Sequence, residues 1–156
     1  VDGFKGLKLR SPSRFAALFL TALGGTPVNM PIAQVTEGIS KGVIDDAMAP
    51  WEVLPATKID EVTKYHMEGA ATQPGFTQTP MAILMNKAKY ESLSPDLKAA
   101  IDKNSGQKLV ELTGSVWDSG NVDARKKMSA QGNKVLVIKP EDYNGMKKAA
   151  ASVEAD

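Results

Sequence analysis

The chain has 156 residues, of which 42% are hydrophobic and 24% are charged, proportions typical of a globular protein with one ordinary core. Its 19 basic and 18 acidic residues nearly cancel, and the net charge of +1 disfavours a nucleic-acid partner, which usually demands a basic excess. The sequence contains no cysteine, which excludes disulfides and thiolate metal sites. No apolar run approaches the roughly 20 residues that span a bilayer.

The first predicted strand ends in an arginine. Leu7 and Leu9 share one face while Lys8 and Arg10 share the other, the alternation typical of a β-strand. The strand brings Arg10 to its carboxyl end just before a helix begins, and in open α/β sheets ligands bind in the crevice outside the strand ends. A guanidinium offers a planar set of donors that suits a carboxylate. We therefore interpret Arg10 as the residue that binds an organic anion.

Short apolar runs alternate with amphipathic stretches over the first 57 residues. Strands are predicted at residues 7–10, 26–30 and 43–45, and helices at residues 11–23, 31–42 and 51–57. Either Ser11 or Ser13 can cap the first helix, since Pro12 is tolerated in a first helical turn. Strands that alternate with helices through short connections imply a parallel sheet, so the predicted fold class is α/β.

The middle of the chain indicates a crossing between two bodies. Residues 63–69 form a further predicted strand, and residues 72–75 form a polar loop or hinge. Residues 76–86 are unusually long and apolar for one strand, and Pro80 should bend this strand or place it on a sheet edge. A strand of that length can pass between two lobes.

A long helix dominates the last part of the chain. Ser94 and Pro95 form a helix start, and apolar residues keep a helical period to about Ala130. Unbroken, this helix would be about 50 Å long, which exceeds the diameter of a compact domain of this size. Three glycines, each costing about 1 kcal/mol relative to alanine, allow a kink or break at residue 106, 114 or 120.

A strand at residues 135–138 and a helix at residues 140–151 complete the predicted elements. So long a helix would extend beyond one compact domain of this size. In a two-lobed protein, a single helix can pack against both lobes. The chain also starts at Val1 without an initiator methionine or a signal-peptide pattern, so we expect a piece of a longer protein. These features predict one complete α/β lobe plus elements that belong to a missing partner lobe.

An ordered series of motifs resembles a known family. The motifs lie at residues 4–10, 23–31, 42–45, 61–65 and 93–95. Together they resemble the DctP-like solute receptors of tripartite ATP-independent periplasmic (TRAP) transporters. The resemblance implies a periplasmic receptor with two α/β lobes that closes on a small organic acid and hands it to the membrane permease subunits. Such receptors are about twice as long, so this chain would hold the second lobe and the C-terminal part and lack most of the first lobe.

The resemblance also implies a division of the chain. Residues 1–72 would form the ligand-binding lobe, a parallel or mixed sheet flanked by helices, as in periplasmic binding proteins. Residues 73–131 would supply the hinge-crossing strand and the long helix shared with the missing first lobe, and residues 132–156 would return to the second lobe. Without the first lobe, part of the apolar stripe of the helix would be uncovered, which favours self-association of the fragment.

The resemblance assigns a ligand role to Arg10, because the matching arginine of the family pairs with the ligand carboxylate. Many members continue the motif at residues 42–45 to an asparagine that contacts the ligand, but here Ala49 stands at that position and Trp51 and Glu52 follow. This departure disfavours sialic acid and dicarboxylates and favours a monocarboxylate with an apolar or aromatic body.

The remaining candidate ligand-binding residues are Ser13, Met30, Ile32 and Phe76. A purely structural role stays open for several candidates. Tryptophans usually bury their ring for packing, and Phe76 can equally belong to a hinge core. Arg10 itself can be a strand-end arginine paired with a surface carboxylate.

Two hypotheses of other classes compete with a binding protein. In the first, a small α/β enzyme acts on an anionic metabolite, with Arg10 orienting the substrate and Asp45 as general base; the second is a structural domain built on the long helix. The only histidine, His66, is expected to be a satisfied structural imidazole, so no catalytic constellation emerges. Asp45 and Asp46 are expected in turn or cap bonds, and we predict no metal, no cofactor and no catalytic residue.

Overall fold

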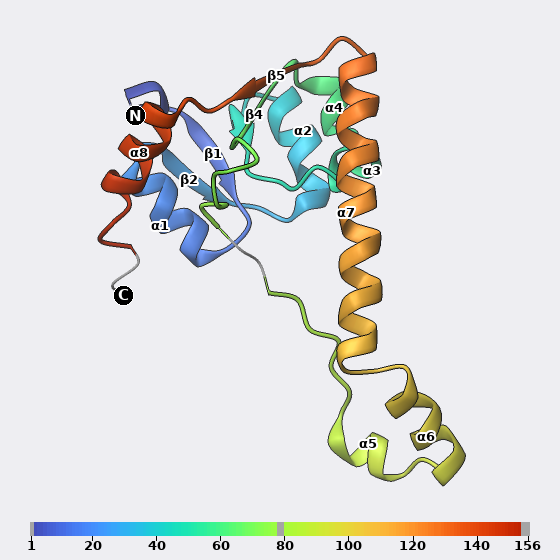
Figure 1. Ribbon diagram of the computed structural model, residues 1–156. Helices are drawn as coiled ribbons and strands as arrows, with labels where there is room; N and C mark the ends of the chain where they lie inside the picture. Colours follow the sequence, from blue (N-terminus) through green and yellow to red (C-terminus); the bar gives the residue numbers. More distant parts are fainter. Residues whose placement is uncertain (1, 78–79, 154–156) are drawn as a thin grey trace.

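A computed structural model describes residues 2–77 and 80–153 (Figure 1). Its first sheet has three parallel strands in the order β2-β1-β3: β1 (Lys8–Ser11), β2 (Thr26–Asn29) and β3 (Asp46–Ala47). The central strand β1 is paired on both sides, and Leu9, Arg10 and Ser11 are all buried. Burial on both faces is typical of a parallel sheet that helices cover.

Short helices connect these strands. A 3₁₀ helix, η1 (Asp2–Phe4), precedes β1, and α1 (Arg14–Ala22) links β1 to β2. The hydroxyl of Ser13 accepts a hydrogen bond from the backbone N–H of Ala16 at 3.2 Å, so Ser13 rather than Ser11 caps α1. The 3₁₀ helix η2 (Ile32–Gln34) and α2 (Val35–Ser40) link β2 to β3.

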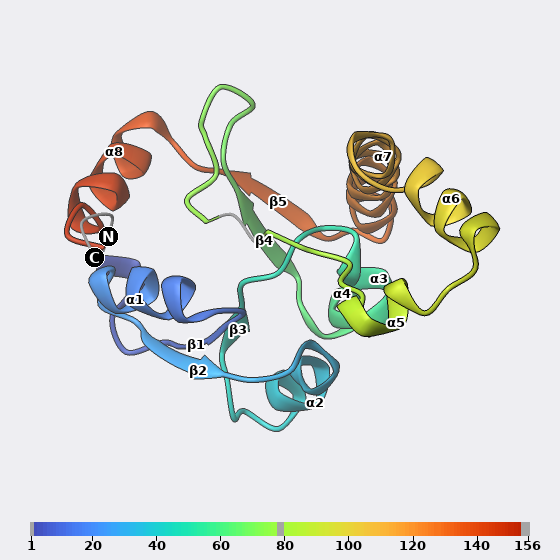
Figure 2. The same ribbon diagram turned by 90° about the horizontal axis from the view of Figure 1, so that it is seen from below.

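A second sheet joins distant parts of the chain. After α3 (Val53–Thr57) and α4 (Ile59–Val62), β4 (Tyr65–Glu68) pairs in parallel with β5 (Lys134–Val137). Helix α8 (Pro140–Ala149) then packs beside α1, as Figure 2 shows. The predicted α/β fold with parallel sheets flanked by helices is therefore confirmed, although α4 was not predicted.

The third strand lies later than predicted. Residues 43–45 are not a strand, and β3 covers Asp46–Ala47 instead. Gly42 has a φ of 68°, and the N–H groups of Val43 and Ile44 both donate to the carbonyl of Gly38. Residues 43 and 44 thus close the end of α2, because a left-handed glycine after a helix lets the following N–H groups return to its last carbonyls.

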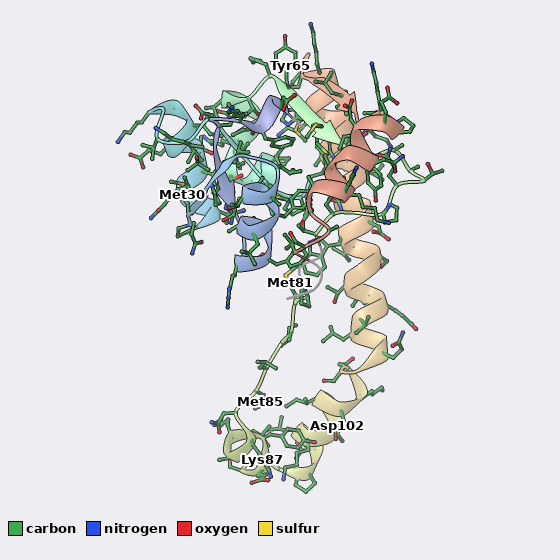
Figure 3. All side chains as sticks on the ribbon, turned by 90° about the vertical axis from the view of Figure 1, so that its left-hand side faces the viewer. Met30, Tyr65, Met81, Met85, Lys87 and Asp102 are labelled. Carbon is green, nitrogen blue, oxygen red and sulfur yellow. The ribbon has the colours of Figure 1, made fainter. Side chains whose placement is uncertain are left out.

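The predicted strand at residues 76–86 is wrong for the described residues 76, 77 and 80–86, none of which is in a strand. Ile83 and Leu84 are 83% and 87% exposed. Figure 3 shows Met81 and Met85 on the extended segment that leads away from the sheets to α5 (Lys87–Glu91), which was also not predicted. A strand needs a neighbouring strand for its backbone hydrogen bonds, and no described segment lies beside this one to provide them.

The long helix is interrupted once. Helix α6 (Pro95–Lys103) ends before Gly106, which has a φ of 63°, and α7 (Gln107–Ala130) begins after it. The break falls at the first of the three predicted glycines, and α7 runs unbroken through Gly114 and Gly120. None of the helices among the described residues combines the length and apolar character needed to cross a membrane.

Only the C-terminal part of α7 is attached to the sheets (Figure 1). Ala124 and Met128 are buried, and the guanidinium of Arg125 forms an ion pair with the carboxylate of Glu68 on β4 at 2.6 Å. Earlier along the helix, apolar side chains are exposed: Val110, Leu112 and Val116. The N-terminal part of α7, with α5 and α6, therefore extends away from the remainder of the described chain.

Two hydrophobic clusters organise the core. The α7 cluster comprises the buried residues Val35, Ile44, Leu54, Ile59, Ala124 and Met128. The α8 cluster comprises Phe19, Leu23, Ile138, Met146 and Ala150.

Candidate functional site

The guanidinium of Arg10 is held at the carboxyl edge of the three-stranded sheet. Its Nε donates to the carbonyl of Met30 at 3.0 Å, and its Nη1 donates to the carbonyl of Met48 at 2.9 Å. Met30 directly follows β2 and Met48 directly follows β3, so the ends of both neighbouring strands fix the orientation of the guanidinium. This is the location at which the strand pattern predicted Arg10.

Arg10 is 7% exposed, yet no carboxylate among the described residues lies within ion-pair distance of it. Burial lowers the pKa of Arg10, but an arginine pKa is so high that the group stays charged at neutral pH. A buried charge is costly unless a charge of opposite sign compensates it. The alternative of a strand-end arginine paired with a surface carboxylate is therefore not supported in the described chain, and the site suits an incoming anion.

Four predicted site residues come together around one hydrophobic cluster. Met30, Ile32, Ala49 and Trp51 are partly buried, and all four pack against the α7 cluster. The backbone carbonyl of Met30 also accepts from Arg10. The strand ends that orient the guanidinium thus also carry partly buried apolar side chains.

Trp51 lies against the only histidine. The ring centroids of Trp51 and His66 are 5.4 Å apart, with the ring planes tilted by 45°. His66 Nε2 is buried and has no hydrogen-bond partner among the described residues, so the prediction of a fully satisfied imidazole is wrong for this nitrogen.

Glu52 faces the long helix. Its backbone N–H donates to Oδ1 of Asn121 on α7 at 3.2 Å, and its carboxylate oxygen Oε2 is buried without a partner in the described chain. No local pattern in the sequence predicts this contact, because 69 residues separate its two partners.

The two aspartates at the third strand have separate local roles. Asp45 Oδ2 accepts from the backbone N–H of Lys8 at 2.7 Å, at the start of β1, whereas Arg10 lies toward the opposite end of that strand. Asp46 Oδ1 accepts from the N–H of Ala47. Burial raises the pKa of the Asp46 carboxyl, while that hydrogen bond and the charge of His66 act in the other direction.

Asp45 was the general base required by the enzyme hypothesis, and its carboxylate is bonded away from the edge that carries Arg10. The observed geometry therefore does not place Asp45 beside the arginine as that hypothesis requires. The part of the chain that the structure describes contains no group of three or more metal-ligating His, Cys, Asp or Glu side chains.

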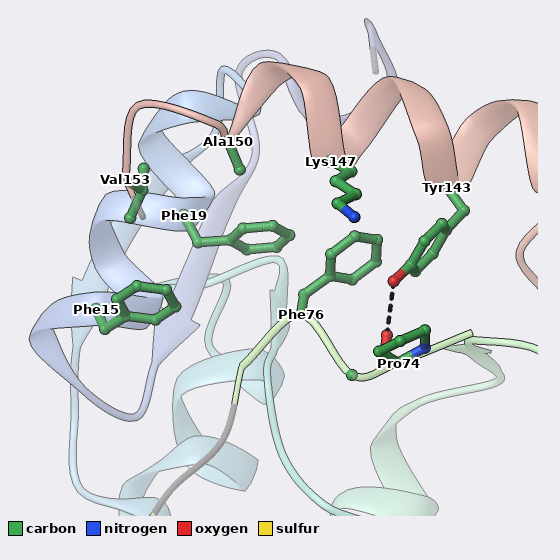
Figure 4. Close-up of a pocket in the computed structure, with 9 residues that line it drawn as sticks. Phe15, Phe19, Pro74, Phe76, Tyr143, Lys147, Ala150 and Val153 are labelled. Carbon is green, nitrogen blue, oxygen red and sulfur yellow. Dashed lines mark hydrogen bonds between the residues drawn. The ribbon is translucent and has the colours of Figure 1, made fainter. Parts of the chain in front are cut away.

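Ser13 and Phe76 are not part of the group around Trp51. The Ser13 hydroxyl caps α1, as described above. Phe76 packs between Phe19 and Tyr143, with ring centroids 5.0 Å and 4.6 Å away, and Figure 4 shows this arrangement. These rings line a cavity of about 140 Å³ between α1, α8 and the segment at Pro74, whose carbonyl accepts from the Tyr143 hydroxyl at 2.9 Å.

Parallel sheets covered by helices, with a buried arginine at the carboxyl edge of one sheet, are compatible with one lobe of an α/β binding protein. The model of the DctP family, described as bacterial extracellular solute-binding protein, family 7, matches residues 1–156. The chain therefore belongs to this family, and the resemblance to TRAP solute receptors is confirmed.

Solved structures of TRAP solute-binding proteins are similar to the chain over nearly its whole length. A protein from an unidentified marine microbe, specific for aromatic acid ligands and solved with meta-hydroxyphenylacetate, is 41% identical with a TM-score of 0.92 over 98% of this chain. A protein from Rhodoferax ferrireducens, solved with copurified benzoate, is 36% identical with a TM-score of 0.87 over 97% of this chain.

A curated relative binds a different kind of acid. The 2,3-diketo-L-gulonate-binding periplasmic protein YiaO of Escherichia coli is 29% identical over 97% of this chain. The chain spans only 39% of that relative, and 48% and 47% of the two structures described above.

Proposed function

We propose that this chain is the ligand-binding half of a periplasmic TRAP receptor that binds a monocarboxylate with an aromatic or apolar body and delivers it to membrane permease subunits. The observation that carries the proposal is Arg10, a buried guanidinium oriented by two backbone carbonyls without a carboxylate partner in the described chain. A ligand carboxylate would supply the missing charge and accept from the N–H groups that the carbonyls leave available.

The apolar surface beside Arg10 favours an aromatic body for the ligand. Ala49 stands where many family members have an asparagine, so this position offers no side-chain amide to a polyhydroxylated acid. Trp51 is half-buried and presents a large ring, and stacked aromatic pairs contribute about 0.5–1.5 kcal/mol beyond their buried area. The related proteins with aromatic acid ligands and with benzoate support the same ligand class for this chain.

We also propose that the site is completed by a first lobe outside this chain. Residues 1–72 and 132–156 would form the second lobe, and residues 73–131 would be shared between the lobes. The exposed apolar side chains of residues 80–86 and of the N-terminal part of α7 support this division, because a covering lobe would remove them from water.

Ligand preference can be tested by a thermal-shift screen of the full-length receptor. Benzoate, 3-hydroxybenzoate and related aromatic monocarboxylates are expected to raise its Tm more than succinate or sialic acid at the same concentration. A ligand stabilises the folded state by RT ln(1 + [L]/Kd), so the order of the Tm shifts follows the order of affinities. A larger shift with succinate or sialic acid than with every aromatic acid would contradict the proposed ligand class.

The exposed part of α7 leads to a prediction about the 156-residue chain on its own. It is expected to self-associate over a concentration series in sedimentation velocity, because its uncovered apolar side chains gain by leaving water. Replacing Val110, Leu112 and Val116 together with serine should shift it towards the monomer. A wild-type chain that stays monomeric at every concentration would contradict this prediction.

A further inference from the structure

The loop that follows β3 carries two parts of the proposed acid site. This site loop, residues 48–52, supplies the Met48 carbonyl that orients Arg10 and the ring of Trp51. None of its residues is in a helix or a strand. The Met48 N–H donates to the carbonyl of Arg10 at 3.0 Å and fixes the near end of the loop, and the Trp51 carbonyl accepts from the Leu54 N–H at 3.2 Å. The part of the loop that carries the Trp51 ring lies between these anchors, so a contact at its far end helps to set the geometry that the site requires.

The far end of the site loop is bonded to α7. The backbone N–H of Glu52 donates to Asn121 Oδ1 at 3.2 Å. It is the one hydrogen bond between the site loop and α7 in the described chain. The Glu52 carboxylate oxygen Oε2 is buried and has no partner there. An acceptor on a helix thus fixes a backbone donor of an otherwise irregular loop.

The neighbouring residue lets the helix approach the loop closely. A Cβ placed on Gly120 would lie 3.3 Å from the Cβ of Glu52, closer than ordinary van der Waals contact. Gly120, Ala124 and Met128 are spaced four residues apart and so share one face of α7, and the latter two are buried in the α7 cluster. The close packing against Glu52 therefore explains why a glycine occupies this position inside an unbroken helix.

Helix α7 is itself well fixed at this level. One turn after Asn121, Arg125 donates to both carboxylate oxygens of Glu68, at 3.0 Å from Nε to each. Because the helix is anchored to β4 and to the core, the amide of Asn121 is a rigid point from which to hold the site loop.

We propose, on the basis of the function proposed above, that Asn121 is a positioning residue of the acid site. It accepts from Glu52 and so holds the far end of the site loop, with Trp51 at the apolar surface, while the backbone bond from Met48 to Arg10 holds the near end. Asn121 is not required to touch the ligand; it acts through the loop.

Calorimetry on the full-length receptor, with benzoate and 3-hydroxybenzoate as probes, tests this role. Asn121→Leu removes the acceptor at similar size and is expected to weaken binding by about 5- to 20-fold, the loss of one hydrogen bond together with disorder in the loop. Asn121→Asp keeps an acceptor at the same place and should recover most of the affinity. The matched control Asn144→Leu, at an exposed position of α8, should bind as the wild type does.

A second measurement reports on the loop without any ligand. In a Trp117→Phe background the remaining tryptophan is Trp51, and Asn121→Leu should make its fluorescence more accessible to quenching by acrylamide while the Tm changes little. Asn121→Asp should restore the quenching of the parent protein.

The outcomes separate this inference from the proposed function. A wild-type receptor that binds no aromatic acid would contradict the proposed function, and Trp51 quenching would then still decide whether Asn121 holds the loop. If the wild type binds and Asn121→Leu changes neither affinity nor quenching, Asn121 is not a positioning residue.

Discussion

Replacing Arg10 with alanine in the full-length receptor is expected to cost at least about 2–5 kcal/mol of binding free energy for an aromatic acid, roughly 30-fold to several thousand-fold in Kd. The ligand carboxylate would leave water without gaining its partner, which explains the size of the loss. Calorimetry of wild type and variant with benzoate measures the difference.

Arg10→Lys separates charge from geometry. Lysine keeps the positive charge but cannot donate to Met30, Met48 and a carboxylate through one planar group, so we expect it to recover only a small part of the affinity. Arg14→Ala is the matched control, because Arg14 is an exposed arginine at the start of α1. A variant Arg10→Ala that binds as tightly as wild type would show that the ligand lies elsewhere.

The second large effect concerns how α7 is attached. Met128→Ala is expected to lower the free energy of unfolding of the chain by about 2–5 kcal/mol, because Met128 is 0% exposed in the α7 cluster and its removal leaves a cavity. Chemical denaturation followed by circular dichroism measures this change.

Leu112→Ala provides the comparison on the same helix. Leu112 is 60% exposed, so its truncation in the 156-residue chain should change the free energy of unfolding by less than about 0.5 kcal/mol. Equal effects of the two substitutions would mean that α7 is not attached to the lobe through its C-terminal part.

The sequence predicted those elements whose signals are local. Alternating side chains located β1, and glycines with positive φ, such as Gly24, mark the ends of helices. The error at β3 has a physical cause, since an apolar run after a glycine reads as a strand, whereas here its first N–H groups return to Gly38. The described residues 76, 77 and 80–86 were mispredicted because a strand depends on a neighbouring strand that local sequence does not reveal.

The candidate site has both local and non-local parts, and its ligand role stays a prediction. Arg10 has a charge, a strand pattern and a family motif that point to it, and Trp51 has a large ring. The carbonyls that orient Arg10 carry no signal in the sequence, because every residue has a carbonyl and only the fold selects Met30 and Met48. The bond from Glu52 to Asn121 joins residues that are distant in the chain and likewise appears only in three dimensions.

The most direct test of the central claim is a crystal structure of the full-length receptor with bound 3-hydroxybenzoate. We expect both carboxylate oxygens within hydrogen-bond distance of the Arg10 guanidinium, which keeps its bonds to Met30 and Met48, and the ligand ring against the apolar surface that includes Trp51. A carboxylate bound away from Arg10, for example at the cavity lined by Phe76 and Tyr143, would contradict the account.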